Sequence, residues 1–221
     1  MEIIQGDIHD EILKIKSNSI NCIYTDPPFN TTNNSWDKKL NWKFLFSEMW
    51  RVLTPNGVII LHSSIPFTYE LISTEKPKYH YVWVKDRSTN FFHAKNQPLR
   101  KEEEILIYYK KQPTYNPQMI GDKFYKKSSA GKSTYYGSRG ENKKFEKNEG
   151  HIGQYPTNVL YYDRKIDGFS TRHPEMIDYF IKTYTNEDDT ILDLTCYNFI
   201  TGKRAVILKR KYIGIDLNPI Y

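Results

Sequence analysis

Residues 20–29 read INCIYTDPPF and join a candidate strand to a rigid, acidic end. The first six residues are mostly β-branched, aromatic or apolar, which predicts a buried strand at 20–25. Two prolines follow Asp26 and end that strand, because proline lacks a backbone donor and fixes φ at about −65°. Ligands of α/β sheets bind beyond the carboxyl ends of the strands. Asp26 is therefore the first candidate site residue.

Strands and helices alternate on both sides of this stretch. The patterning predicts strands at 2–5, 20–25, 58–62, 79–84, 104–109, 190–193 and 212–216, and longer helices at 42–53, 175–181 and 201–209. Ile12, Leu13 and Ile15 suit one face of a short helix, and residues 54–57 (TPNG) predict a stop and a turn. Such alternation is typical of an α/β fold with a doubly wound, mostly parallel sheet.

The positive charge of the chain is concentrated in one segment. The net charge is +6, and residues 110–150 alone hold ten basic against four acidic residues, interleaved with aromatic rings. This composition favours a polyanionic partner, and a solvated surface loop is the alternative for the segment taken alone. The candidate nucleic-acid contacts are Lys123, Lys126, Lys127, Lys132, Arg139, Lys143 and Lys144. We expect a target-recognition insertion at 110–170 between two halves of one domain, 1–109 and 171–221.

The composition excludes several other classes of protein. Aromatic residues make up 15% of the 221 residues, too many for a disordered chain. We see no apolar run of about 18 residues and no signal-peptide pattern, so we expect a cytoplasmic protein without membrane contact. The only cysteines, Cys22 and Cys196, lie in apolar runs and are predicted to be buried thiols. The histidines lack a ligand spacing, so no metal site is predicted.

The chemistry available at residues 26–29 suits an exocyclic amine on a nucleobase. The carboxylate of Asp26 and the carbonyl of Pro27 can accept hydrogen bonds from the amine, Pro27 and Pro28 fix the turn, and Phe29 can stack on an extruded base. Those hydrogen bonds favour the tetrahedral, nucleophilic form of an amine whose lone pair is otherwise delocalised. A rigid turn with no chemical role remains the simpler explanation of the tetrapeptide taken alone.

In its wider context the sequence resembles the amino-methyltransferases of DNA, in the arrangement whose catalytic motif precedes the cofactor motif. The segments that carry the resemblance are 6–10 (GDIHD), 23–30 (IYTDPPFN), 50–58 (WRVLTPNGV), 100–109 and 211–218 (KYIGIDLN). The catalytic motif usually begins with Asp in adenine-N6 members of the family and with Ser in cytosine-N4 members. The resemblance therefore implies an adenine-N6 methyltransferase of DNA.

The family implies a Rossmann-like fold, base flipping, S-adenosylmethionine as the methyl donor and, often, a homodimer. On the catalytic side it implies Asp26, Pro27, Pro28 and Phe29. On the cofactor side it implies Asp7, Asp193, Thr195, Asn198, Thr201 and Asp216. An acid at a strand end also suits the hydroxyls of a ribose without reference to the family. Buried, paired acids are the alternative reading of Asp7 and Asp216.

The cofactor loop departs from the family pattern, which has Gly-Ser-Gly-Thr after the acid. This chain has Tyr197, Asn198, Phe199 and Ile200 there, and the rings occupy space that the cofactor's methionine part would need. The family's His-Pro-Thr-Gln-Lys-Pro is shortened at 171–176 (TRHPEM). Three functions stay open: an adenine-N6 methyltransferase with a remodelled loop, a methyltransferase-like DNA-binding protein or silent partner of an active subunit, and a base-amine enzyme using a different donor.

Overall fold

A computed structural model describes residues 1–126, 150–167 and 169–219, and between 165 and 171 it describes the backbone alone. The chain divides into two compact units. The larger unit joins Met1–Asn116 to Asn158–Tyr221, and the smaller one is Pro117–Thr157.

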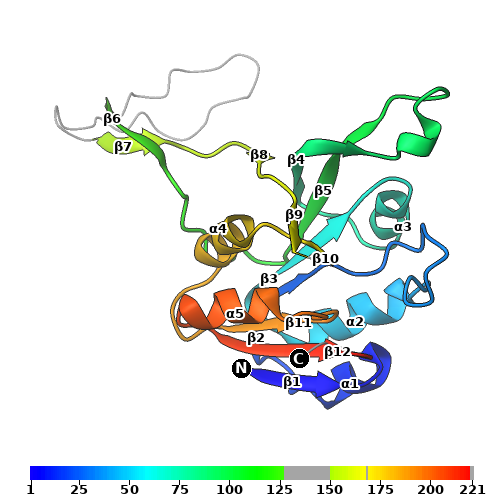
Figure 1. The fold of residues 1–221 in the computed structure, drawn as a ribbon. Coiled ribbons are helices and arrows are strands. Elements are labelled where there is room, and N and C mark those ends of the chain that lie inside the picture. Colours follow the sequence, from blue (N-terminus) through cyan, green and yellow to red (C-terminus); the bar gives the residue numbers. More distant parts are fainter. Residues whose placement is uncertain (127–149, 168, 220–221) are drawn as a thin grey trace. The chain divides into compact units, whose positions relative to one another are not determined.

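An eight-stranded sheet forms the centre of the larger unit, in the order β1-β12-β11-β2-β3-β5-β4-β8 (Figure 1). Its strands are β1 (Glu2–Gln5), β2 (Ile20–Thr25), β3 (Leu53–Ser63), β4 (Tyr79–Thr89), β5 (Arg100–Tyr108), β8 (Val159–Tyr161), β11 (Thr190–Asp193) and β12 (Lys211–Asp216). The strands from β1 to β3 run parallel, β5 is antiparallel to both neighbours, and β8 is parallel to β4. The predicted doubly wound, mostly parallel sheet is confirmed.

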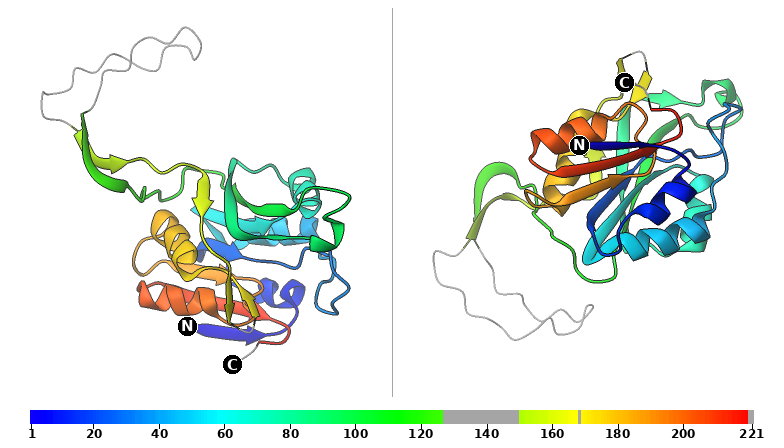
Figure 2. Two further views of the ribbon diagram at one scale, coloured as in Figure 1. Left: turned by 45° about the horizontal axis from the view of Figure 1, so that its top comes forward. Right: turned by 90° about the horizontal axis from the view of Figure 1, so that it is seen from below.

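Helices cover both faces of the sheet (Figure 2). Helices α1 (Ile8–Lys14), α2 (Trp42–Val52) and α3 (Phe67–Thr74) contribute to one buried apolar cluster, and α4 (Pro174–Tyr184) and α5 (Ile200–Ile207) to the other. Strand β2 feeds both clusters, because successive side chains of a strand point to opposite faces: Ile23 joins the first, and Cys22 and Tyr24 join the second. The two helical layers thus bury the sheet and leave the strand ends for ligands.

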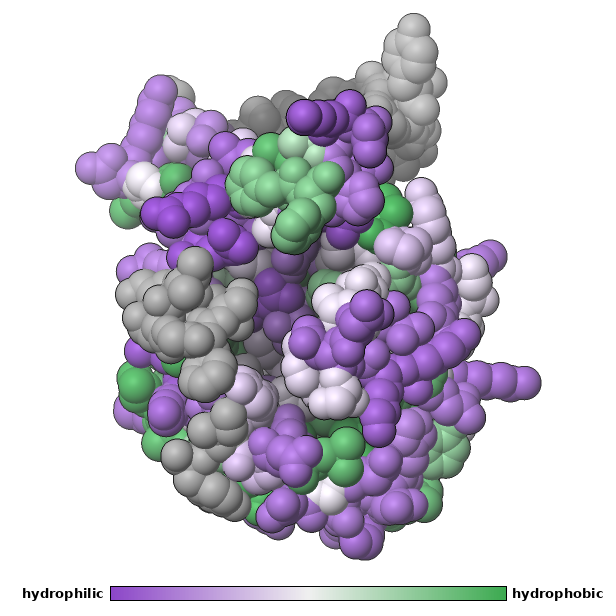
Figure 3. Space-filling view, turned by 45° about the vertical axis from the view of Figure 1, so that its right-hand side comes forward, coloured by the Kyte–Doolittle hydropathy of each residue, from purple (hydrophilic) through white to green (hydrophobic). Residues whose placement is uncertain are grey.

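Both cysteines are buried and free, as the sequence predicts. Burial raises the pKa of the Cys22 and Cys196 thiols, so neither is a reactive thiolate near neutral pH. Among the described residues, no helix has the length and apolar character that crossing a membrane requires. Hydrophilic residues cover most of the surface in Figure 3, and hydrophobic ones form small separate groups there.

Two local predictions are wrong. Residues 54–57 form no turn, because β3 begins at Leu53, directly after α2, and the pairing of β2 with β3 instead shifts register between Ile20 and Cys22. Leu13 does not face the core, since its side chain is exposed, while Ile8, Ile12 and Ile15 are buried. The short helix therefore presents a different face from the one predicted.

The smaller unit contains a two-stranded antiparallel hairpin, β6 (Ile120–Lys126) and β7 (Gly150–Gln154). Sequence periodicity did not predict these strands, because most of their side chains are exposed and no buried face imposes alternation. The remaining short elements, the 3-10 helix η1 (Phe91–His93), β9 (Lys165–Asp167) and β10 (Phe169–Thr171), belong to the larger unit.

Candidate active site

Residues 26–29, the target-base corner, follow β2 directly. The side chain of Asp26 keeps 39% of its surface exposed, while Pro27 is buried and anchors the turn. The half-buried ring of Phe29 stacks on the ring of Phe67 from α3, with centroids 5.2 Å apart and planes inclined by 21°. The corner therefore presents an accessible carboxylate on a fixed backbone beside a fixed ring.

Asp37 holds the chain that leaves the target-base corner. Its carboxylate accepts hydrogen bonds from the backbone N–H groups of Asn30 at 2.5 Å, Thr31 at 2.9 Å and Thr32 at 2.6 Å. Burial opposes the charge, but these hydrogen bonds outweigh it and lower the pKa of Asp37. A buried, ionised carboxylate thus stabilises the loop beyond Phe29, a role the sequence analysis missed.

The carboxylate of Asp26 is paired with Arg172, which lies just before α4. Nη2 of Arg172 is 2.5 Å from Oδ1 of Asp26, and Nη1 is 2.6 Å from Oε2 of Glu103 on β5. The other oxygen of Glu103, Oε1, accepts from Nζ of Lys85 on β4 at 3.0 Å. Two carboxylates and two cations therefore form a chain of alternating charge that leads from the sheet to Asp26.

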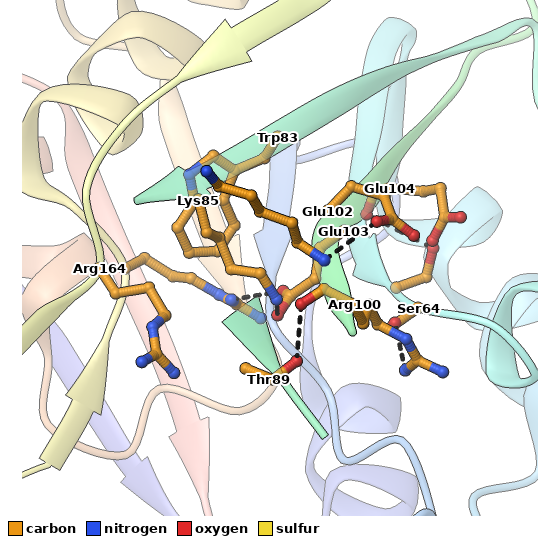
Figure 4. Close-up of polar contacts among 12 residues, drawn as sticks. Ser64, Trp83, Lys85, Thr89, Arg100, Glu102, Glu103, Glu104 and Arg164 are labelled. Atoms are coloured by element: carbon orange, nitrogen blue, oxygen red, sulfur yellow. Dashed lines mark hydrogen bonds and ion pairs between the residues drawn. The ribbon is translucent and has the colours of Figure 1, made fainter. Parts of the chain in front are cut away.

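The ring of Trp83 packs against both cations of this chain. Its centroid is 5.0 Å from the guanidinium carbon of Arg172 and 5.9 Å from Nζ of Lys85. Figure 4 shows Lys85 and Glu103 pointing toward one another near that ring. Burial opposes the charge of Arg172, but Asp26 and Glu103 outweigh it and raise its pKa; likewise Arg172 and Lys85 overcome burial and lower the pKa of Glu103. Arg172 and Glu103 are therefore both charged near neutral pH.

Asp193 lies at the end of β11, next to β2 in the sheet. It is 4% exposed, and burial raises its pKa to about 7, although hydrogen bonds including those from the Thr195 N–H at 3.2 Å and the Tyr212 hydroxyl at 3.2 Å act against the shift. The Thr195 hydroxyl is 2.8 Å from that of Thr25, which immediately precedes Asp26. The target-base corner and the cofactor side thus meet where β2 and β11 end.

The cofactor loop, residues 193–201, keeps a left-handed backbone without its glycines. Tyr197 has φ +32° and Phe199 has φ +57°, values that favour glycine. The ring of Phe199 is 5% exposed and packs in the core cluster of α4 and α5, whereas Tyr197 is 40% exposed. Asn198 accepts from the N–H of Ile200 at 3.3 Å, which helps to start α5. The buried ring therefore points into the protein interior.

Two further acids lie at neighbouring strand ends. Asp216, at the end of β12, accepts from the backbone N–H groups of Tyr197 and Asn218, each at 2.9 Å. Asp7, just after β1, caps α1 by accepting from the His9 N–H at 2.9 Å and pairs with its ring, and these bonds lower the pKa of Asp7. Thr201 is buried in the first turn of α5. The predicted cofactor residues thus cluster on β1, β12 and β11 and their loops.

The predicted nucleic-acid contacts divide into two groups. Lys123 and Lys126 lie exposed on β6 of the smaller unit, and Nζ of Lys123 is 5.7 Å from the centroid of the Tyr125 ring. Lys127, Lys132, Arg139, Lys143 and Lys144 fall outside the described residues. Arg172, which pairs with Asp26, and Glu103 and Lys85, which hold Arg172 in place, were not predicted. The shortened segment 171–176 was the only signal that pointed toward one of them.

A doubly wound sheet with acids at its strand ends defines a protein of the α/β class whose ligands bind beyond those ends. A family model described as DNA methylase, of the N6 and N4 type, matches residues 20–221, and the chain belongs to this family. It is 28% identical to the DNA adenine methyltransferase YhdJ of Escherichia coli K12, over 99% of this chain and 79% of that one. It is 25% identical to the type II methyltransferase M.BglII of Bacillus subtilis, over 100% of this chain and 66% of that one.

Solved structures agree on the fold. The cytosine-N4-specific PvuII DNA methyltransferase matches with a TM-score of 0.68 at 14% identity. The match covers 99% of this chain and 82% of the PvuII chain. A complex of M1.HpyAVI with SAM has a TM-score of 0.60 at 17% identity, over 98% and 92%. The predicted family and Rossmann-like fold are confirmed: the chain is a DNA amino-methyltransferase of the N6-adenine or N4-cytosine type.

Proposed function

We propose that this chain methylates the exocyclic N6 amine of adenine in double-stranded DNA, with S-adenosylmethionine as the donor. The observation that carries the proposal is the accessible carboxylate of Asp26 on a fixed turn beside a fixed aromatic ring. The likeness to an adenine methyltransferase, at 28% identity, supports adenine over cytosine. The aspartate that opens the catalytic motif supports the same choice.

The residues of the target-base corner divide the work on the amine. Asp26 and the Pro27 carbonyl each accept one amine hydrogen, which turns the nitrogen lone pair out of the base plane and makes it nucleophilic. The ring of Phe29 stacks on the extruded base and keeps its plane fixed. S-adenosylmethionine supplies an electrophilic methyl group on a positively charged sulfur. The amine would gain a bond to the methyl carbon as the bond from that carbon to sulfur breaks, so the sulfur would leave as a neutral thioether. The amine would lose one proton along its hydrogen bond to Asp26.

The cofactor side fits this donor despite the lost glycines. The backbone at Tyr197 and Phe199 already has the left-handed φ that glycines serve in such loops, and the Phe199 ring is directed into the core. Each oxygen of the Asp216 carboxylate accepts one backbone N–H, which leaves further lone pairs for ribose hydroxyls. We assign Asp216 to the ribose, Asp7 to the adenosine side, and Asp193, Thr195, Asn198 and Thr201 to the loop that surrounds the donor.

The same proposal assigns target recognition to the predicted insertion 110–170, between the catalytic halves 1–109 and 171–221. Lys123 and Lys126 contact phosphates in this reading, and the neighbouring aromatic rings contact bases or sugars. Lysine–phosphate contacts release counterions, so DNA binding should weaken steeply with added salt.

The test incubates the purified chain with S-adenosylmethionine and plasmid DNA free of methylated bases, and identifies the product nucleosides by mass spectrometry. We expect N6-methyladenine, and Asp26→Asn should lower the rate by about 1,000-fold or more because one acceptor for the amine becomes a donor. Asp188→Asn, a change of an exposed carboxylate in a turn before β11, is the matched control and should keep the wild-type rate.

Other outcomes identify the alternative functions. N4-methylcytosine would show the other amine as the target. Salt-sensitive DNA binding without any modified base, in a chain that also fails to bind S-adenosylmethionine by calorimetry, would identify a silent partner. An adenine adduct other than methyl would show a different donor.

A further inference from the structure

Arg172 contacts only one of the two oxygens of Asp26. Its Nη2 donates to Oδ1 at 2.5 Å, and no donor among the described residues reaches Oδ2. The arginine side chain is 15% exposed, whereas that of Asp26 is 39% exposed. The carboxylate is therefore held from the protein side and open on its other oxygen.

The guanidinium itself is held by groups on the sheet. Glu103 accepts from Nη1 at 2.6 Å, and Glu103 is in turn paired with Lys85, whose side chain is almost fully buried. The ring of Trp83 lies 5.0 Å from the guanidinium carbon, and its indole N–H donates to the Tyr162 carbonyl at 2.7 Å. These contacts restrict how far Arg172 can move, so its position is set by the sheet.

The backbone next to the Arg172 side chain is also held in place by the start of α4. The next residue, His173, is the N-cap of α4 and accepts from the Glu175 N–H at 3.2 Å, and Pro174 occupies the first turn. The shortened segment therefore enters the helix immediately after Arg172, which fixes the backbone from which its side chain extends.

We propose that Arg172 is a positioning residue for methyl transfer: it holds Oδ1 of Asp26 so that Oδ2 faces the target amine. This inference rests on the proposed function. The target amine is neutral, so a bound base adds no charge that would compete with Asp26 for Arg172. Without the guanidinium, the carboxylate rotates about its terminal torsion and spends less time in the geometry that orients the amine.

The test compares Arg172→Met and Arg172→Lys in the full chain. We expect Arg172→Met to lower kcat by about 100-fold, with KM for DNA changed by less than about threefold, because the base still binds but its amine is poorly aligned. Arg172→Lys restores one donor, and its kcat should be about tenfold higher than that of Arg172→Met. Wild-type activity, and its loss in Asp26→Asn, must be measured first on the same plasmid DNA.

The matched control is Arg204→Met, since Arg204 also pairs with a carboxylate, Asp178, in the contact between α5 and α4. This variant should lower the melting temperature and keep kcat. Glu103→Gln, which leaves Arg172 and Asp26 in place, should lower kcat by less than Arg172→Met does.

Several results would overturn the inference. They are a folded Arg172→Met chain with kcat near wild type, a loss confined to KM, an equal loss of kcat in Arg204→Met, or a kcat above wild type, which would mean that the guanidinium blocks the amine. An inactive wild-type chain would instead count against the proposed function. In that case fluorescence anisotropy with DNA, unchanged in Arg172→Met, would still show that Arg172 is not needed for DNA binding.

Discussion

The target-base corner and the cofactor loop follow adjacent parallel strands, yet they are held in place by different means. The corner is fixed by side chains: Arg172 and Phe67 hold Asp26 and Phe29 from elements distant in the sequence. The cofactor loop is fixed by its backbone, with positive φ at Tyr197 and Phe199 and a backbone N–H donated to Asp216.

This difference predicts that the two regions respond differently to substitution. A side-chain network fails when one charge is removed, because the partner charge is then left buried and unpaired. A backbone conformation survives the loss of its glycines if a bulky replacement finds a buried site that compensates for the strain. Phe199 has such a site in the core, whereas Tyr197 is substantially exposed.

Among substitutions that test this comparison, Phe199→Gly is expected to change the free energy of unfolding most. Glycine restores the family residue and relieves the positive φ, but it removes a buried ring, and we expect a net loss of about 4 kcal/mol in the free energy of unfolding. Denaturant titration measures it. Phe92→Gly, at a fully exposed phenylalanine of η1, is the control and should change stability by less than about 1 kcal/mol. A stabilised Phe199→Gly chain would mean that backbone strain outweighs the packing.

A second effect, visible only as a pH dependence, is expected from Asp193→Asn. Burial raises the pKa of Asp193 to about 7 from the usual 3.8. Between these pH values the folded chain keeps a proton that the unfolded chain has lost, so stability falls as the pH rises through that window. We expect the two proteins to be equally stable near pH 4 and the asparagine variant to be more stable by about 4 kcal/mol well above pH 7.

Thermal melting of the cofactor-free proteins across this range makes the measurement. Buried His62, whose pKa burial lowers, gives the opposite slope below its usual value of 6.5, but it does so in both proteins and cancels in the difference. Asp188→Asn should follow the wild type at every pH. A constant offset between wild type and Asp193→Asn would show that Asp193 is ionised throughout.

Local signals predicted most of the fold and half of the site. Residues 20–25 and 190–193 form strands with the predicted bounds, because buried parallel strands are continuous apolar runs. The position of Asp26 follows from the prolines behind it. Its partner Arg172 is 146 residues away along the chain, and no local pattern connects two such positions.

Glu103, the partner of Arg172, could not be singled out from the sequence because its two neighbours are also glutamates. Glu103 stands between Glu102 and Glu104, and only the pleat of β5 decides which of the three reaches Arg172 and Lys85. The cofactor loop shows a different limit of sequence rules. The rule that bulky residues avoid positive φ describes a cost, and the core contacts of Phe199 offset that cost in a way that sequence cannot show.

The smallest expected effect, and the closest test of the backbone argument, is Tyr197→Gly. Its φ of +32° is strained for tyrosine, and the N–H that donates to Asp216 remains in glycine. We expect a gain of about 1 kcal/mol in the free energy of unfolding, opposite in sign to Phe199→Gly. Tyr161→Gly, at a more exposed tyrosine on β8, is the control and should lose about 1 kcal/mol because glycine weakens a strand. Equal losses at both tyrosines would mean that the loop does not store strain at Tyr197 and that its contacts decide the conformation.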